Sequence, residues 1–325
     1  MKTDNSRWTV AILAAGQGTR MCSDLPKVLH PLAGRPLVDH VIDLALGIAR
    51  PHDVVVVVGH QAEAVTSVVR ERGVGEVVQE PQFGTGDALR VALEGLRNRP
   101  TDRILVLSGD VPLLRPETLR GLTGAVVDGI VAALLSAELD EPGTYGRVVR
   151  DADGMVREVV EARDADPKEL AIREVNAGVY AFDRDPLSEA LAGLETDNVQ
   201  DEYYLTDVAA ALRAKGLAVA AVRLEDPEEM QGVNTRADLA RAGRVLNRRI
   251  LEELMAFGVT LRDPATTWVD PRAKVDREVV LEPGVVLRGP CHIGAGARIG
   301  ANCVLDSAAV GAGEVIPPLT YLTGE

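Results

Sequence analysis

Apolar residues follow two different spacing patterns along the first part of the chain. Continuous apolar runs, typical of strands buried on both faces, occur at Trp8–Ala15, Val54–Gly59 and Arg103–Leu107. Leu37–Ala49 and Ala62–Arg72 instead repeat their apolar residues with the period of an amphipathic helix. This alternation predicts an α/β fold with a Rossmann-like, mainly parallel sheet that carries helices on both faces.

The same patterns predict further elements as far as residue 257. Asp151-Ala152-Asp153-Gly154 is a strong hairpin signal between two of the strands. We therefore expect residues 130–183 to form an antiparallel insertion that walls one side of a ligand crevice. The further strands are Glu76–Gln79, Ile130–Leu139, Tyr145–Val149, Met155–Val160, Glu174–Asp183 and Ala218–Leu224, and the further helices are Asp87–Arg97, Leu205–Lys215 and Arg236–Phe257.

Aliphatic residues then recur at every sixth position near the C-terminus. They are Val269, Val275, Leu281, Leu287, Ile293, Ile299 and Leu305. A period of six is the signature of hexapeptide parallel β-helices, in which these side chains stack into one core. We expect a nucleotidyltransferase-like unit at residues 1–235, a linker helix at 236–262 and a short left-handed β-helix at 263–325, with Pro317-Pro318 closing its register.

Composition narrows the classes of partner. The net charge of −14 argues against nucleic acid and against an anionic membrane. The three cysteines suit neither a disulfide framework nor a zinc site, and no apolar stretch approaches the ~18–20 residues of a transmembrane helix. We therefore expect a cytoplasmic protein with no membrane or nucleic-acid partner.

The loop that follows the first apolar run carries candidate chemistry. Gly16 and Gly18 offer bare backbone amides, and Arg20 and Lys27 offer fixed cations, which together suit a polyphosphate. The glycines match neither the dinucleotide fingerprint nor a Walker loop, so on the glycines alone a structural turn remains an alternative. Prolines in the loop argue against a regular helix before Leu37.

Other polar residues follow the ends of the predicted strands. Ligands of open parallel sheets bind beyond these ends, so the opening loop, Gln79–Gly86 and Ser108–Asp110 should meet in one crevice. Asp110 suits either a Mg²⁺ ligand or a helix cap, and local sequence alone favours a cap for Asn234. The five histidines share no ligand spacing, and we expect them to be structural or surface residues.

At this point the motifs resemble a known family. The chain closely resembles the nucleotidyltransferase half of bacterial N-acetylglucosamine-1-phosphate uridylyltransferases. The matching motifs are Leu13-Ala14-Ala15-Gly16-x-Gly18-Thr19-Arg20-Met21, Leu25-Pro26-Lys27, Gln79-x-x-Gln82-x-Gly84-Thr85-Gly86, Gly109-Asp110-Val111-Pro112-Leu113, Tyr145-Gly146-Arg147, Val160-Glu161, Asn176-x-Gly178, Glu202-Tyr203-Tyr204-Leu205-Thr206-Asp207 and Gly232-Val233-Asn234.

The resemblance implies a reaction between UTP and a sugar 1-phosphate with Mg²⁺ as cofactor, and it assigns the site residues in four groups. Uridine would be held by Leu13, Ala14, Ala15, Gly16, Gln79, Gly84 and Thr85, and the ribose and metal would lie beside Ser108, Gly109 and Asp110. Arg20 and Lys27 would face the phosphates, Gly146, Glu161, Asn176, Tyr204 and Thr206 would hold the amino sugar, and Asp110 with Asn234 would bind Mg²⁺. The catalytic set would be Arg20, Lys27 and Asp110, with no protein nucleophile.

Two departures from the family limit what the resemblance implies. Cys22 and Ser108 stand where tyrosine is common in the family. The repeat region holds only about three coils, so we expect no acetyltransferase activity from this chain. Other sugar phosphates, or a non-catalytic regulatory subunit that binds a sugar nucleotide, stay open as alternatives, and the β-helix could join chains into a homotrimer.

Overall fold

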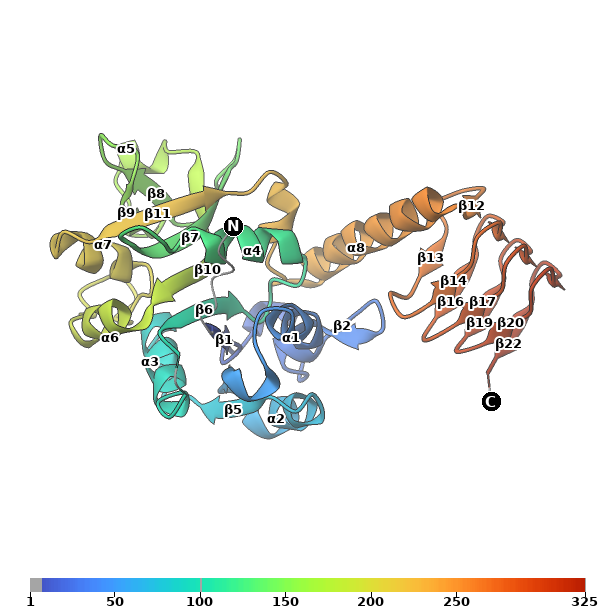
Figure 1. Cartoon of the computed structure of the whole chain (residues 1–325), viewed down its shortest axis with the longest axis horizontal. Helices are drawn as coiled ribbons and strands as arrows, with labels where there is room; N and C mark the ends of the chain where they lie inside the picture. The colour runs from blue at the N-terminus through green and yellow to red at the C-terminus, as the bar shows by residue number, and fades with distance from the viewer. Residues whose placement is uncertain (1–7, 100, 325) are drawn as a thin grey trace. The chain divides into compact units, whose positions relative to one another are not determined.

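The computed structural model describes residues 8–99 and 101–324, which divide into two compact units (Figure 1). The first unit contains the described residues up to His30 together with Pro36–Thr235. The second contains Pro31–Arg35 and the described residues from Arg236 onward. The long helix that follows Thr235 therefore groups with the C-terminal repeats.

A mixed sheet forms the centre of the first unit, with strand order β11-β7-β10-β6-β1-β4-β5. Its strands are β1 (Trp8–Leu13), β4 (Val54–Val58), β5 (Gly75–Val78), β6 (Arg103–Ser108), β7 (Ile130–Glu138), β10 (Glu174–Asp183) and β11 (Ala218–Arg223). Parallel pairing joins β6 to β1, β1 to β4, β4 to β5 and β7 to β11. The predicted α/β fold with a mainly parallel sheet is confirmed.

Strand β10 departs from the expected arrangement. It pairs antiparallel with both β6 and β7, so it lies in the middle of the sheet rather than in a separate insertion. Only the hairpin of β8 (Arg147–Arg150) and β9 (Val156–Val160) projects from this block, and it is attached to the sheet through β10. The expectation of an insertion was therefore wrong for β7 and β10, because both strands lie within the sheet and bury apolar residues on both of its faces.

Helices cover the two faces and explain the continuous apolar strands. Val10 and Ile12 pack into the hydrophobic cluster beneath α1, α2 and α4, whereas Ala11 packs into the cluster beneath α3, α6 and α7. Successive strand residues point to opposite faces, so both sets must be apolar. The helices of this unit are α1 (Leu37–Leu46), α2 (Ala62–Glu71), α3 (Thr85–Gly95), α4 (Pro116–Gly124), α5 (Pro167–Leu170), α6 (Arg184–Ala192) and α7 (Asp207–Ala214).

Short elements fill the connections. The opening loop contains no α-helix before α1, as its prolines predict, but it forms 3-10 turns η1 (Thr19–Met21) and η2 (Lys27–Leu29). Further 3-10 turns are η3 (Pro51–Asp53) and η4 (Pro227–Met230), and two short strands, β2 (Pro31–Leu32) and β3 (Arg35–Pro36), precede α1.

Besides Pro31–Arg35, the second unit contains α8 (Arg236–Phe257) and three parallel sheets in which strands three apart along the chain pair with one another. The seven aliphatic residues at every sixth position are all buried in one cluster, so the hexapeptide architecture is confirmed. The strands are β12 (Thr260–Leu261), β13 (Trp268–Val269), β14 (Lys274–Val275), β15 (Val280–Leu281), β16 (Val286–Arg288), β17 (His292–Ile293), β18 (Arg298–Ile299), β19 (Val304–Asp306), β20 (Ala309–Val310), β21 (Val315–Ile316) and β22 (Tyr321–Thr323).

The repeat continues beyond the point at which the sequence was expected to end it. After Pro317-Pro318, β22 still pairs in parallel with β19, and Leu322 packs against the core cluster. Between Leu305 and Val310 the spacing shortens by one residue and then returns to six, at Ile316. The prediction that the prolines close the register was wrong, because they occupy a turn between strands rather than a ladder position.

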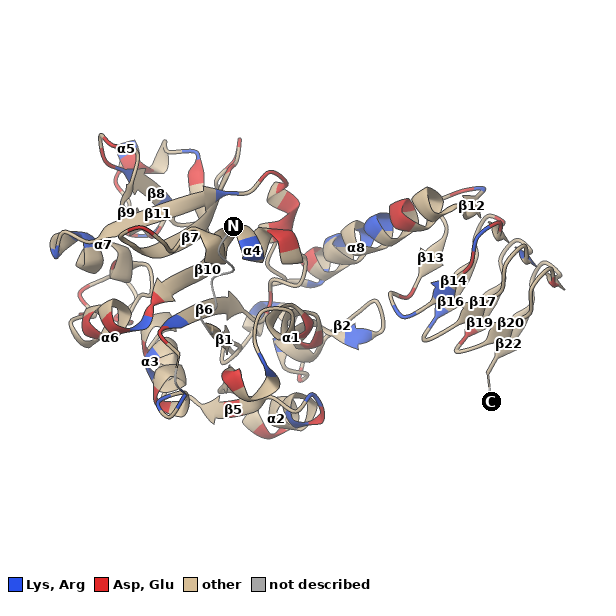
Figure 2. Ribbon diagram, viewed as in Figure 1, with Lys and Arg blue, Asp and Glu red and all other residues tan. Residues whose placement is uncertain are grey.

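Acidic and basic residues are interspersed on the described elements, including along α8 (Figure 2). Within residues 8–99 and 101–324, no helix combines the length and the apolar character needed to cross a membrane.

Candidate functional site

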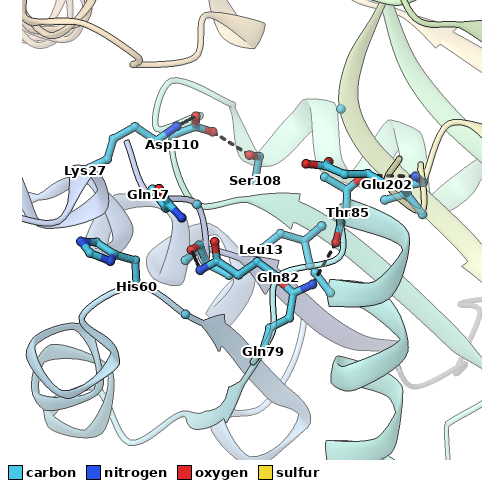
Figure 3. A pocket seen from close by; sticks show the side chains of 18 of the residues that line it. Leu13, Gln17, Lys27, His60, Gln79, Gln82, Thr85, Ser108, Asp110 and Glu202 are labelled. Carbon is cyan, nitrogen blue, oxygen red and sulfur yellow. Dashed lines mark hydrogen bonds and ion pairs between the residues drawn. The ribbon is translucent and has the colours of Figure 1, made fainter. Parts of the chain in front are cut away.

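A cavity of about 1050 Å³ opens at the carboxyl ends of β1, β4, β5 and β6 (Figure 3). The loop after each of these parallel strands contributes to its walls. The lining residues are Leu13, Ala14, Ala15, Gly16, Gln17, Lys27, Val28, Gly59, His60, Gln61, Gln79, Glu80, Pro81, Gln82, Gly84, Thr85, Ala88, Ser108, Asp110, Glu161, Asn176, Gly178, Tyr180, Glu202, Leu205 and Thr206.

Backbone contacts hold the segment after β1 at the floor of the cavity. The Gln82 side-chain amide donates a hydrogen bond to the carbonyl of Ala15 (2.6 Å). Leu13 accepts from the amide of Gly109 (2.9 Å), and the amide of Ala14 donates to Val57 (2.9 Å). These bonds tie the turn between the neighbouring strands, so its position is fixed before any ligand arrives.

Gly18 allows the opening loop to double back on itself. Its φ of 64° lies in the left-handed region, and a Cβ there would come within 2.5 Å of the Lys27 Cβ. A larger residue would be strained and would push Lys27 away. Gly18 therefore allows both the turn of the loop and the close approach of Lys27.

Two polar side chains, Asp110 and Asn234, contact the Lys27 ammonium at one end of the cavity. Lys27 Nζ lies 2.5 Å from Asp110 Oδ2 and donates to Asn234 Oδ1 (3.1 Å), which also accepts from the Arg20 guanidinium (3.1 Å). The Ser108 hydroxyl donates to Asp110 Oδ1 (2.6 Å). The side chains of Lys27 and Asp110 are each only 14% exposed, so their charges are partly shielded from solvent.

This arrangement bears on the two readings of Asp110 and the role of Asn234. Asp110 does not begin a helix, since α4 starts only at Pro116. An Asp carboxylate and an Asn amide oxygen share one cation here, which is the donor chemistry that Mg²⁺ prefers. Among the described residues no three His, Cys, Asp or Glu side chains form a metal cage. A divalent ion at this point would take its other ligands from phosphate oxygens and water.

The opposite wall carries a carboxylate beside hydroxyl groups. Glu161 Oε1 accepts a hydrogen bond from the Thr206 hydroxyl (3.2 Å). Burial raises the pKa of the Glu161 carboxyl above its ordinary value, and the nearby Asp207 and Asp164 raise it further against the hydrogen bond from Thr206. Ionised, this carboxylate is an acceptor that suits sugar hydroxyls.

A bulge in β10 turns Asn176 toward the same wall. The pairing of β10 with β7 shifts register between Asn176 and Tyr180. The Asn176 side-chain amide donates to the Tyr180 hydroxyl (2.6 Å), and its backbone amide donates to the carbonyl of Gly146 (2.9 Å). Bulges commonly redirect a side chain in this way beside a binding site.

The structure brings most of the sequence-derived candidates to the cavity. Leu13–Gly16, Lys27, Gln79, Gly84, Thr85, Ser108, Asp110, Glu161, Asn176 and Thr206 line it. Arg20 and Asn234 lie next to Lys27 without lining the cavity, whereas Gly109 and Gly146 contribute backbone contacts behind the wall. Tyr204 is buried outside the lining.

Sequence reasoning assigned no role to several lining residues. Gln17, Pro81 and Gln82 lie in stretches that were expected at the crevice but received no role of their own, whereas His60 and Gln61 were not expected there. His60 and Gln61 directly follow β4, so the strand-end argument could have included them. His60 was expected to be a structural or surface residue; it is exposed, and it also lines the cavity.

Comparison with known proteins gives matches to both units. A family model described as MobA-like NTP transferase domain matches residues 10–171, and one described as bacterial transferase hexapeptide (six repeats) matches residues 272–307.

Full-length relatives are also similar. The chain is 46% identical over 308 residues to the bifunctional protein GlmU of Streptomyces coelicolor, which covers 94% of this chain and 64% of that protein. It is 45% identical over 315 residues to the bifunctional protein GlmU of Burkholderia thailandensis, and this match covers 97% of this chain and 69% of that protein. The chain is also 45% identical over 313 residues to the bifunctional protein GlmU of Thermobifida fusca, and this match covers 94% of this chain and 64% of that protein.

Proposed function

The chain belongs to the GlmU family, and on that premise we propose that its first unit transfers uridylate from UTP to N-acetylglucosamine-1-phosphate, giving UDP-N-acetylglucosamine and pyrophosphate. The observation that carries this proposal is the Lys27 ammonium held between Asp110 and Asn234 at one end of the cavity. The chain spans 64% of the length of the relatives from Streptomyces coelicolor and Thermobifida fusca, and we do not extend the proposal to acetyl transfer.

The reaction needs alignment and charge neutralisation rather than a protein nucleophile. A phosphate oxygen of the sugar 1-phosphate attacks the α-phosphorus of UTP, and the bond from that phosphorus to the bridging oxygen of pyrophosphate breaks. Lys27 and Arg20 would offset the negative charge that gathers on the phosphates, and fixed cations in a partly shielded site do this without reorganisation. The walls hold the base and the sugar so that the two phosphates face each other.

A divalent metal ion fits the same site. NTP transferases of this kind generally use one, and we propose Mg²⁺ held by Asp110 and Asn234. Both side chains already share a cation in the structure, the Lys27 ammonium. When bound, the metal would neutralise phosphate charge and orient the triphosphate. Lys27 would then turn from Asp110 toward the phosphates.

Pyrophosphate release tests the proposed function. The chain is assayed with each of UTP, CTP, GTP and ATP against N-acetylglucosamine-1-phosphate and glucose-1-phosphate, with Mg²⁺ and with excess EDTA. We expect turnover with UTP and the N-acetylated sugar, and its loss in EDTA. A preference for glucose-1-phosphate would replace the proposed sugar, and silence with every pair would favour the non-catalytic alternative.

We further propose that the second unit assembles into a homotrimer. Core residues alternate with outward residues along each short strand, and on the β13-β16-β19-β22 sheet the outward residues form an apolar column of Trp268, Val286, Val304 and Tyr321. Trp268 is 42% exposed and Tyr321 is 64% exposed. Large aromatics in register on an exposed sheet are typical of an interface.

A charge in this column is expected to dissociate the assembly. Trp268→Asp should convert a trimer to monomers in sedimentation velocity, because burying an unpaired carboxylate opposes association. Lys274→Asp, on an exposed position of another sheet, is the matched control and should leave the mass unchanged. A monomeric wild-type chain, or a trimeric Trp268 variant, would contradict the proposal.

A further inference from the structure

The side chain of Gln79 is held in a single orientation at the far end of the cavity from Lys27 and Asp110 (Figure 3). Gln79 follows β5 and is only 3% exposed. Its amide nitrogen donates to the carbonyl of Gly84 (3.0 Å) and to Asp87 Oδ2 (2.9 Å). A carbonyl and a carboxylate only accept hydrogen bonds, so the nitrogen and not the oxygen of the amide must face them.

That constraint leaves the amide oxygen for the cavity. Both N–H groups of the Gln79 amide are used by Gly84 and Asp87, and within the described residues no hydrogen bond to Oε1 is formed. Gln79 lines the cavity, so its wall presents an acceptor there and not a donor. A ligand that meets this atom must offer an N–H or O–H group.

Asp87 is itself held in place from behind. It lies in the first turn of α3 with its side chain 14% exposed, and Arg90 Nη1 lies 3.4 Å from its Oδ1. Arg90 also donates to the carbonyl of Leu191 (3.1 Å) and lies over the ring of Tyr203 at 4.7 Å. The carboxylate is therefore fixed by a charged partner that is anchored on two other segments.

We propose that Asp87 is a positioning residue for base selection, because it keeps the Gln79 amide oxygen turned toward the nucleobase. Uracil offers N3–H at the position where cytosine has an unprotonated N3. The fixed oxygen would accept from uracil, whereas with cytosine two acceptors would face each other and both would stay unsatisfied. This inference rests on the proposed function and adds the reason for a preference for UTP over CTP.

The substitution Asp87→Asn tests it. An Asn amide can donate as well as accept, so of the two acceptors that fix the Gln79 amide only the Gly84 carbonyl would still require its nitrogen. The turned-over amide, which offers its nitrogen to cytosine, then becomes less unfavourable than in the wild type. We expect the wild type to favour UTP over CTP by about 100-fold in kcat/KM and the variant to lose about 10-fold of that ratio, mainly through KM. Because Asp87 contacts Gln79 and not the phosphate end, kcat at saturating UTP should change by less than about 3-fold.

Matched variants and a binding readout separate the outcomes. Glu94→Gln makes the same carboxylate-to-amide change at an exposed position of α3 and should leave the ratio unchanged. Asp87→Ser, whose hydroxyl can also donate or accept, repeats the test if the Asn variant does not fold. Calorimetric titration with UDP and with CDP measures the base preference without turnover.

The possible results distinguish this inference from the proposed function. An unchanged UTP to CTP ratio in the Asp87 variants, or an active wild type that does not discriminate between the two, overturns the inference and leaves the transfer reaction intact. A wild type that releases no pyrophosphate overturns the proposed function, and the UDP and CDP titrations then still decide whether Asp87 sets the base preference.

Discussion

Replacing Lys27 by alanine is expected to lower kcat for pyrophosphate release by about 10²–10³-fold, the cost typical of removing one preorganised charge-stabilising group. Two anionic substrates must approach each other in this reaction. Without the ammonium, Asp110 loses the cation at 2.5 Å and its carboxylate instead adds to the repulsion. Steady-state kinetics with UTP, the sugar phosphate and Mg²⁺ at saturation would measure the effect.

Two variants control for charge and for folding. Lys168→Ala removes an exposed lysine in α5, away from the cavity, and should retain full activity. Lys27→Arg keeps the charge but not the compact ammonium, so we expect only partial recovery. A fully active Lys27→Ala protein with an unchanged melting temperature would show that Lys27 is not part of the catalytic set.

Ile293→Ala should destabilise the second unit by about 2–5 kcal/mol, the usual range for removing a large aliphatic side chain from a core. Ile293 is fully buried and lies in the ladder between Val275 and Val310. Each coil of the repeat supports its neighbours, so a cavity in the middle coil weakens the contacts above and below it. Urea unfolding followed by circular dichroism would report the loss.

His292 provides the matched control because it precedes Ile293 and faces outward. Its side chain is 60% exposed and lies 3.9 Å from Asp276, so His292→Ala should change the free energy of unfolding by no more than about 0.5 kcal/mol. Equal losses for the two variants would contradict the assignment of Ile293 to the core and of His292 to the outer face.

The elements that could be predicted are those in which one pattern of apolar residues determines the structure. Val54–Val58 is apolar at every position because both faces of its strand are covered, and Ile293 and Ile299 keep the six-residue spacing because every coil has the same shape. Helix α8 was predicted with the bounds that the structure has. In each case local sequence and tertiary packing favour the same element.

The parts that could not be predicted depend on contacts between distant segments. The place of β10 between β6 and β7 is not visible in its own composition, which suits a strand in either direction. Helices α4 and α6 were not predicted, although their buried residues keep helical spacing, as Leu119 and Leu122 do in α4. In the site, the contact of Asp87 with Gln79 depends on how α3 packs after β5, so neither residue's role in the pair could be read from its neighbours.

The position of Asn234 has a consequence for how the protein is made. Lys27 and Asn234 meet across 207 residues of chain, which a ribosome adds in about 10–40 s at about 5–20 residues per second. A nascent chain can already contain β1, β4 and β6 while the amide partner of Lys27 has not been synthesised. Until that segment emerges, the ammonium has Asp110 but not Asn234, and the phosphate end of the cavity is incomplete on the ribosome.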